Sequence, residues 1–286
     1  MTIDTRKTIL RELKKQRKEE ELPLLLAFFQ GLVKVQLAAE KNLTKPVSGL
    51  NEQDIQTRLD EGTPLVGLQE LALDWAAFSI AFSSVLPVFS AYSELFGETR
   101  ASLDNAGADP QILRSAVEDW YSGKPLPPDF LPDLGDSLRT TIIQSAMQPF
   151  LSAWADALKS SVKQDYWRRE YCPICGGRPD LAYLEKEVGG RMLLCSRCDF
   201  EWAFPRLECP FCRNKDQKKL SFYSDEGGRY RLHVCDNCRG YMKIIDTRQA
   251  GPEVLLPLER LYTLDLDVQA KELGYSNSGS SPAPTQ

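Results

Sequence analysis

Residues 171–177, Tyr171-Cys-Pro-Ile-Cys-Gly-Gly177, contain the first of four Cys-x-x-Cys motifs, which together hold all eight cysteines of this 286-residue chain. Nineteen residues separate the first motif from the second, ten separate the second from the third, and twenty-two separate the third from the fourth. A Cys-x-x-Cys turn directs two thiolates to one point, and a second turn about twenty residues later completes a four-thiolate cage. The spacing therefore predicts two consecutive metal sites. Their predicted ligands are Cys172, Cys175, Cys195 and Cys198 for the first and Cys209, Cys212, Cys235 and Cys238 for the second.

An internal repeat supports the division into two modules. Residues 188–195 (Val-Gly-Gly-Arg-Met-Leu-Leu-Cys) resemble residues 226–235 (Glu-Gly-Gly-Arg-Tyr-Arg-Leu-His-Val-Cys). A double glycine between two strand-like runs favours a hairpin, because glycine adopts positive φ without a steric cost. Gly176 follows the first motif, where the turn needs a left-handed residue, whereas Asp199 and Arg213 occupy the equivalent positions in the second and third motifs.

Other uses of the cysteines fit the sequence less well. Four disulfides need an oxidising compartment, and no credible secretory signal is present. A thioredoxin-like dithiol occurs singly in a βαβ context. One metal site beside one redox-switching module stays open as an alternative. His233, the only histidine, precedes Cys235 by two residues, and we expect it to pack beside the cage because four thiolates already complete each site.

Composition excludes several classes of protein. A hydrophobic content of 42%, a charged content of 26% and a net charge of −5 are typical of a soluble protein. A single histidine excludes catalytic sites that need a histidine pair, and no phosphate-binding glycine motif is present. Between residues 166 and 249, sixteen basic side chains face twelve acidic ones, and eight thiolates with two divalent ions bring this region to about zero charge. Nucleic-acid binding, which zinc ribbons often provide, is therefore not expected.

Helical patterns dominate the first half of the chain. Residues 1–21 alternate basic and acidic side chains and indicate a solvated helix. The apolar run at residues 22–33 is too short to cross a bilayer and indicates a core helix. Apolar side chains between residues 138 and 158 recur with helical spacing. Near the C-terminus, residues 254–256 suggest a strand and residues 258–273 a helix that packs back on the molecule.

The sequence therefore predicts an α+β protein. An all-helical N-terminal domain is followed by two tandem rubredoxin-like or zinc-ribbon-like four-cysteine metal modules and a C-terminal helix. The expected boundaries are 1–165 for the helical domain, 166–207 and 208–250 for the first and second modules, 251–275 for the helix, and 276–286 for a disordered tail.

Three motifs resemble the FdhE family of formate dehydrogenase accessory proteins. They are Trp167-Arg-Arg-Glu-Tyr-Cys-Pro-Ile-Cys-Gly176, Cys195-x-x-Cys-x-x-x-Trp-x-x-x-Arg206 and Cys235-x-x-Cys-x-x-Tyr-x-Lys243. The resemblance covers residues 140–275 well, whereas the N-terminal third matches only in helical character and length. It implies a cytoplasmic maturation factor, not an enzyme, that binds the catalytic subunit of a respiratory formate dehydrogenase before export. It also implies iron in rubredoxin-like sites, although four thiolates accept zinc equally well.

We expect the partner surface to lie beside the first module. Arg168 and Arg169 can pair with carboxylates, and Trp167 is a candidate apolar anchor, so these three residues are the hypothesised contacts of the catalytic subunit. The alternative is that Trp167 packs against the first metal site and that both arginines are solvated. The rival function is that of a rubredoxin-like electron carrier. The sequence contains no signal for the oligomeric state.

Overall fold

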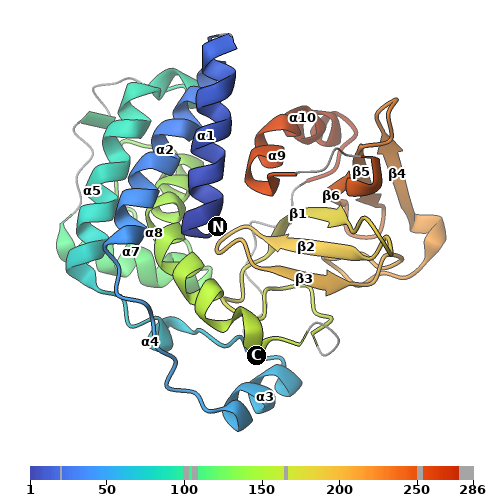
Figure 1. The fold of residues 1–286 in the computed structure, drawn as a ribbon, viewed down its shortest axis with the longest axis horizontal. Helices are drawn as coiled ribbons and strands as arrows, with labels where there is room; N and C mark the ends of the chain where they lie inside the picture. Colours follow the sequence, from blue (N-terminus) through green and yellow to red (C-terminus); the bar gives the residue numbers. More distant parts are fainter. Residues whose placement is uncertain (20, 99–102, 105–108, 164–166, 250–253, 277–286) are drawn as a thin grey trace. The chain divides into compact units, whose positions relative to one another are not determined.

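Helices occupy the first part of the chain and strands follow them, as Figure 1 shows. The computed structural model describes residues 1–19, 21–98, 103–104, 109–163, 167–249 and 254–276. The chain divides into two units. The first unit comprises Met1–Val47 and Leu68–Ala157, and the second comprises Ser48–Gly67 and Leu158–Gln286.

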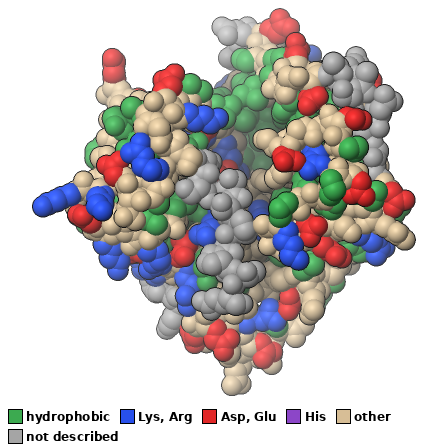
Figure 2. Space-filling view, turned by 180° about the vertical axis from the view of Figure 1, so that it is seen from behind, with side chains coloured by type: hydrophobic (Ala, Val, Ile, Leu, Met, Phe, Trp, Pro, Cys, Tyr) green, Lys and Arg blue, Asp and Glu red, His purple; other side chains and the backbone are tan. Residues whose placement is uncertain are grey.

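Surface charges of both signs are interspersed on the face drawn in Figure 2. This mixture agrees with the net charge of −5. A strongly basic stripe, which nucleic-acid domains need to bind phosphates, is not visible on this face.

The described residues of the first unit form helices joined by loops and no strand. Its helices are α1 (Ile3–Glu19), α2 (Leu24–Lys41), α4 (Leu68–Leu71), α5 (Trp75–Ala91), α7 (Pro110–Ser122) and α8, which runs from Asp136 to Leu158. Helix α2 packs against both α1 and α5. Buried aromatic rings meet edge to face in the core, with 5.1 Å between Phe28 and Phe89 and 5.8 Å between Phe78 and Phe150.

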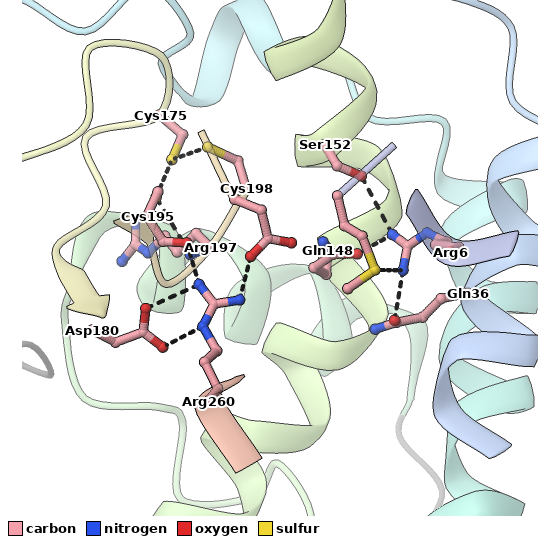
Figure 3. Close-up of polar contacts among 12 residues, drawn as sticks. Arg6, Gln36, Gln148, Ser152, Cys175, Asp180, Cys195, Arg197, Cys198 and Arg260 are labelled. Atoms are coloured by element: carbon pink, nitrogen blue, oxygen red, sulfur yellow. Dashed lines mark hydrogen bonds and ion pairs between the residues drawn. The ribbon is translucent and has the colours of Figure 1, made fainter. Parts of the chain in front are cut away.

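Helix α1 is not the solvated helix that its charge pattern predicts. Arg6, Ile9 and Leu13 are fully buried, because one face of α1 packs on α2. The Arg6 guanidinium donates to Glu40 Oε2 at 2.7 Å. It also donates to Gln36 Oε1 at 2.8 Å and to the Gln148 side chain (Figure 3). Burial raises the pKa of Glu40, whereas Arg6 lowers it. An ion pair and two amides thus satisfy a buried charge within the unit.

The second unit contains one six-stranded sheet. The strands are β1 (Pro179–Leu184), β2 (Arg191–Cys195), β3 (Glu201–Phe204), β4 (Leu220–Ser224), β5 (Tyr230–Cys235) and β6 (Gly240–Asp246), in the order β3-β2-β1-β6-β5-β4. Four of the five neighbouring pairs are antiparallel, and β1 pairs with β6 in parallel, with Leu181 opposite Lys243. Every residue of β2 and β6 is buried, whereas the edge strand β4 is largely exposed.

The two cysteine modules therefore form the two halves of one continuous sheet and are not separate subdomains. Each module is a three-stranded meander that contains the Gly-Gly hairpin predicted from the repeat, and the hairpin turns contain Gly189 and Gly228 at φ values of 65° and 67°. The β1–β6 pairing joins the first strand of one meander to the third strand of the other.

Two short helices replace the single C-terminal helix that the sequence predicts. Helix α9 spans Leu256–Tyr262 and α10 spans Leu264–Glu272, with a break at Thr263. Residues 254–256 form no strand, because Leu256 and Pro257 begin α9, and proline is well suited to the first turn of a helix. Helix α10 contacts β5 and β6, as predicted for a helix that packs back. The predicted disorder of the tail concerns residues 277–286, which lie outside the described residues.

A segment from the helical half of the sequence belongs to the second unit. It holds α3 (Glu52–Glu61), which starts at an Asn51 capping box and ends at Gly62 with φ of 83°. Leu65 N donates to Pro173 O at 2.9 Å and Val66 N donates to Ile174 O at 2.8 Å. Residues 65 and 66 therefore contact the first cysteine motif, although more than a hundred residues separate them from it in the sequence. Among the described helices, none combines the length and apolar character needed to cross a membrane.

Candidate metal centres

The first four predicted cysteines form one buried cluster. Sγ of Cys172 lies 3.6 Å from Sγ of Cys198, and Sγ of Cys175 lies 3.5 Å from those of Cys195 and Cys198. All four side chains are buried, and none forms a disulfide. The predicted grouping of these four sulfurs is confirmed.

The last four cysteines form the second cluster. Sγ–Sγ distances are 3.7 Å between Cys209 and Cys238 and 3.7 Å between Cys212 and Cys235. Cys212 and Cys238 are only partly buried, whereas Cys209 and Cys235 are buried. This grouping is also the one that the spacing predicts.

The sulfur spacing fits a metal ion in either cluster. A disulfide needs sulfurs about 2.05 Å apart. A tetrahedron with metal–sulfur bonds of about 2.3 Å has edges of about 3.8 Å. The observed distances of 3.5–3.7 Å lie close to this edge. Each cluster can thus hold one ion of a metal that prefers thiolates, such as iron or zinc, and leaves no open position on it.

All four motifs use the same turn. In the first three motifs, the amide four residues beyond the first cysteine donates back to its carbonyl: Gly176 N to Cys172 O at 3.0 Å, Asp199 N to Cys195 O at 3.2 Å, and Arg213 N to Cys209 O at 3.1 Å. The residue after each motif is left-handed, at Gly176, Asp199, Arg213 and Arg239, with φ between 57° and 69°. A non-glycine residue in this region costs about 1 kcal/mol. Three of the four turns therefore accept backbone strain in order to direct both sulfurs inward.

Amide groups hydrogen-bond to sulfurs of both clusters. In the first cluster, Ile174 N lies 3.4 Å from Cys172 Sγ and Arg197 N lies 3.4 Å from Cys195 Sγ. In the second, the Asn237 side chain donates to Cys212 Sγ at 3.5 Å. Such bonds favour the thiolate form that binds metal.

The thiol pKa values differ within the second cluster. Burial raises the pKa of Cys209 well above its usual value. Burial also acts to raise the pKa of Cys212, but the hydrogen bond from Asn237 and those from neighbouring groups lower it to about 7. In the metal-free chain this lower pKa favours the thiolate of Cys212, which is the form that binds metal.

A buried group of charged side chains, which includes Arg260 from the C-terminal part of the chain, supports the first metal centre. Arg260 of α9 forms two contacts of 2.9 Å with Asp180, pairs with Asp199 and donates to Cys195 O at 2.8 Å (Figure 3). Burial opposes the charge of Arg260, but the carboxylates of Asp180 and Asp199 raise its pKa above the usual value. Since Asp199 is the left-handed residue of its turn, this arginine holds the turn in place.

Other polar contacts support the second centre. Glu208, which precedes the third motif, pairs with Arg213 at 2.8 Å and Lys215 at 3.6 Å. Arg239 lies over the Tyr275 ring at 4.1 Å and donates to Leu273 O. The fourth motif is thus tied to the residues after α10.

His233 lies beside the second cluster. Its ring stacks on Phe222 with 5.3 Å between centroids and an interplanar angle of 21°. Burial lowers the pKa of His233 to about 3, and the charges of Arg191 and Arg231 act in the same direction. The ring is therefore neutral at neutral pH and is not one of the grouped ligand candidates among the described residues.

The three predicted partner contacts have different environments. Trp167 is fully buried, and its Nε1 donates to Tyr171 O at 2.7 Å, so this side chain cannot serve as a surface anchor. Arg169 lies over the Trp167 ring and donates to Asp60 O at 3.1 Å. Arg168 is exposed.

Sequence reasoning missed the residues that hold the first centre from afar. These are the segment 62–66 and Arg260, which meet the cluster through hydrogen bonds to the first two motifs. Neither carries a local signal, because their partners lie more than sixty residues away in sequence. The Tyr171 hydroxyl, which donates to Gly62 O at 2.8 Å, belongs to the same set.

Comparisons with known proteins identify relatives. No family model matches the chain. It is 28% identical over 230 residues to a "Protein FdhE homolog" of Aquifex aeolicus, which covers 79% of this chain and 76% of the relative. It is 26% identical over 243 residues to "Protein FdhE" of Escherichia coli, which covers 81% of this chain and 74% of the relative.

A solved structure shares the fold. The crystal structure of the FdhE protein from Pseudomonas aeruginosa matches with a TM-score of 0.68 at 23% identity, over 99% of this chain and 96% of that one. The resemblance predicted from the cysteine motifs is thus confirmed, and so is the predicted architecture of a helical N-terminal region, a sheet with two cysteine clusters and C-terminal helices.

Proposed function

We propose that this chain, a relative of the FdhE proteins, is a formate dehydrogenase accessory protein that binds the catalytic subunit of the enzyme in the cytoplasm before export. It would act as a chaperone during maturation of the enzyme, with iron or zinc in two four-cysteine sites. The observation that carries this proposal is the pair of four-sulfur clusters in a chain whose named relatives match it over about four fifths of its length.

The chemistry of the clusters favours a binding protein over an enzyme. Four thiolates leave no open position on a metal for water or substrate, so such sites stabilise a fold or transfer electrons. All eight cysteines belong to the clusters, and the only histidine is a partly buried ring stacked on Phe222. The groups most often used as nucleophile or general base are therefore engaged elsewhere.

Arg168 is the first choice for a contact with the catalytic subunit. It is the exposed member of the predicted set, whereas Trp167 is buried and Arg169 hydrogen-bonds within the unit. An exposed guanidinium can form a two-pronged hydrogen bond with a carboxylate of the partner.

A pull-down of the immature catalytic subunit tests the proposal. The tagged chain, loaded with metal, is expected to retain the subunit, and a host that lacks the chain is expected to lose formate dehydrogenase activity. Arg168→Ala should weaken retention at least about tenfold, or about 1.4 kcal/mol, while Lys186→Ala, a second exposed cation of the same unit, should not. Full enzyme activity in the deletion host would refute the function; unchanged retention by Arg168→Ala would refute only the contact.

A rubredoxin-like electron carrier is the second candidate. The partial exposure of Cys212 and Cys238 favours it, because electron transfer needs a metal close to the surface. An absorbance spectrum of the protein purified without oxygen identifies the metal. A reversible reduction potential in the physiological range supports the carrier, whereas bound zinc or an inaccessible potential contradicts it.

A further inference from the structure

A cavity of about 230 Å³ lies beside the second cysteine cluster, within the second unit. It is bounded by β2, β4, β5 and β6 and by the third cysteine motif. Its polar lining includes Arg191, Arg206, Arg231 and His233, and its apolar lining includes Phe222 and Met242. A water molecule occupies about 30 Å³, so the cavity has the volume of roughly eight waters. A small organic acid has a similar volume.

Two buried nitrogens at this cavity have no hydrogen-bond partner among the described residues. They are Nε of Arg191 and Nε2 of His233. Arg191 is 4% exposed, and its other contacts go to the backbone carbonyls of Pro205 and Glu208, not to a carboxylate. A buried polar group without a partner costs free energy, so a ligand that supplies an acceptor here would be stabilised.

The charges around the cavity favour an anion. Arg206 is exposed and has no ion pair with any described residue. Arg231 pairs with Asp246 at 2.6 Å, but Asp246 also accepts from Arg248 at 2.7 Å. The one acid in the lining, Glu208, is already paired with Arg213 and Lys215.

The cluster itself carries negative charge, which must be included. Four thiolates around a divalent ion sum to −2. Six cations stand against this charge and the carboxylates of Glu170, Glu208 and Asp246: they are Arg191, Arg206, Arg213, Lys215, Arg231 and Arg248. The sum stays positive, and neither Arg191 nor the exposed Arg206 forms an ion pair with a carboxylate of a described residue.

One wall of the cavity is flat and aromatic. The rings of Phe222 and His233 stack, and the Arg231 guanidinium lies 5.5 Å from the Phe222 centroid. Phe222 is nevertheless 54% exposed, on the edge strand β4. A planar apolar group can cover this ring and remove it from water.

We propose that this cavity binds a small organic anion that combines one carboxylate or phosphate group with a flat apolar body. The anionic group faces Arg191 and Arg206, and the apolar body lies along Phe222 and His233. Because Cys209 and Cys235 also line the cavity, the bound anion sits against the second metal centre. This inference is independent of the proposed function.

Titration calorimetry of the metal-loaded full chain with benzoate tests the site. We expect saturable binding of benzoate, with binding of neutral benzamide at least about tenfold weaker, since the charged group supplies the stronger hydrogen bonds. Inorganic phosphate, which lacks the apolar body, should also bind at least about tenfold more weakly than benzoate. No saturable binding of benzoate, or equal binding of benzamide, would overturn the proposal.

Two variants locate the binding. Arg206→Gln should weaken benzoate about tenfold while metal content stays unchanged, because Arg206 is exposed and has no structural partner; Lys186→Gln is the matched control and should bind as the parent does. Phe222→Ala should weaken benzoate and leave phosphate binding as it was. If Arg206→Gln binds benzoate undiminished, the arginines only balance the charge of the thiolates, and the proposal is wrong.

Discussion

The two cysteine clusters share one turn geometry and differ in how much protein covers them. The first is buried at all four sulfurs, and its motifs contact segment 62–66 and Arg260. The second leaves Cys212 and Cys238 only partly buried, and the exposed Asn237 side chain donates to Cys212 Sγ. The same Cys-x-x-Cys turn thus occurs in one buried centre, called the sealed centre below, and in one centre that solvent reaches. The two centres differ in burial because distant parts of the chain cover only the first.

Loss of one ligand in each cluster should give the largest contrast. Cys209→Ser should lower the metal content from about two ions per chain to about one and loosen β4–β6, whereas Cys172→Ser should also release segment 48–67 and destabilise the whole second unit. Metal binding by such sites contributes on the order of 10 kcal/mol to folding. Metal analysis and hydrogen exchange measure both effects. Two tightly bound ions in Cys209→Ser would sink the assignment of two sites.

Metal release should distinguish the intact clusters. With a chromophoric chelator in excess, we expect two phases, with the second cluster releasing its ion at least about tenfold faster, because solvent reaches Cys212 and Cys238. The single-cluster variants assign the phases. A fast phase that persists in Cys209→Ser would belong to the first cluster and reverse the comparison.

A methyl group at Gly177 should disturb only the sealed centre. A Cβ there would lie 2.8 Å from Cys195 Sγ, closer than packing allows, so Gly177→Ala should lower the free energy of unfolding of the second unit by about 1–3 kcal/mol. Gly49→Ala is the control, since nothing lies within 4 Å of its added Cβ. Thermal unfolding gives the stability, and the slow phase of metal release should become faster in Gly177→Ala alone.

The smallest effect is expected at the accessible centre. Asn237→Ala removes the 3.5 Å hydrogen bond to Cys212 Sγ and should weaken metal binding at the second cluster about fivefold, or about 1 kcal/mol. Competition with a chelator of known affinity measures this change, and the affinity of the first cluster serves as the internal reference. An equal loss at both clusters would show that Asn237 acts through the sheet and not through the sulfur.

Local patterns predict what local chemistry decides. The pairing of the cysteine motifs follows from their spacing, and the two Gly-Gly hairpins follow from the repeat, because both depend on residues close in sequence. Left-handed backbone at Arg213 and Arg239 contradicts residue preference, since the geometry of the sulfur cluster outweighs about 1 kcal/mol of strain.

Contacts between residues far apart in the chain could not be predicted from the sequence. Nothing in residues 48–67 marks them as partners of the first motif, and nothing in β1 marks β6 as its neighbour. The buried face of α1 could not be predicted, because arginine is usually a surface residue. Arg6 is buried only because Glu40 and Gln36 accept its hydrogen bonds. In each case the deciding partner lies at least thirty residues away, where periodicity carries no information.

The parallel pairing of β1 with β6 sets an order of events during synthesis. Each meander needs only neighbouring strands, so the first can close around its metal while the second is still within the ribosome. The pairing of Leu181 with Lys243 must wait for the last strand, because closing so long a loop is entropically expensive. Until then, one edge of β1 has no hydrogen-bonded neighbour. The residues of β1, most of which are buried in the complete sheet, are then exposed to solvent. A metal ion that binds the first cluster at this stage would therefore bind a chain that has not yet acquired its final sheet.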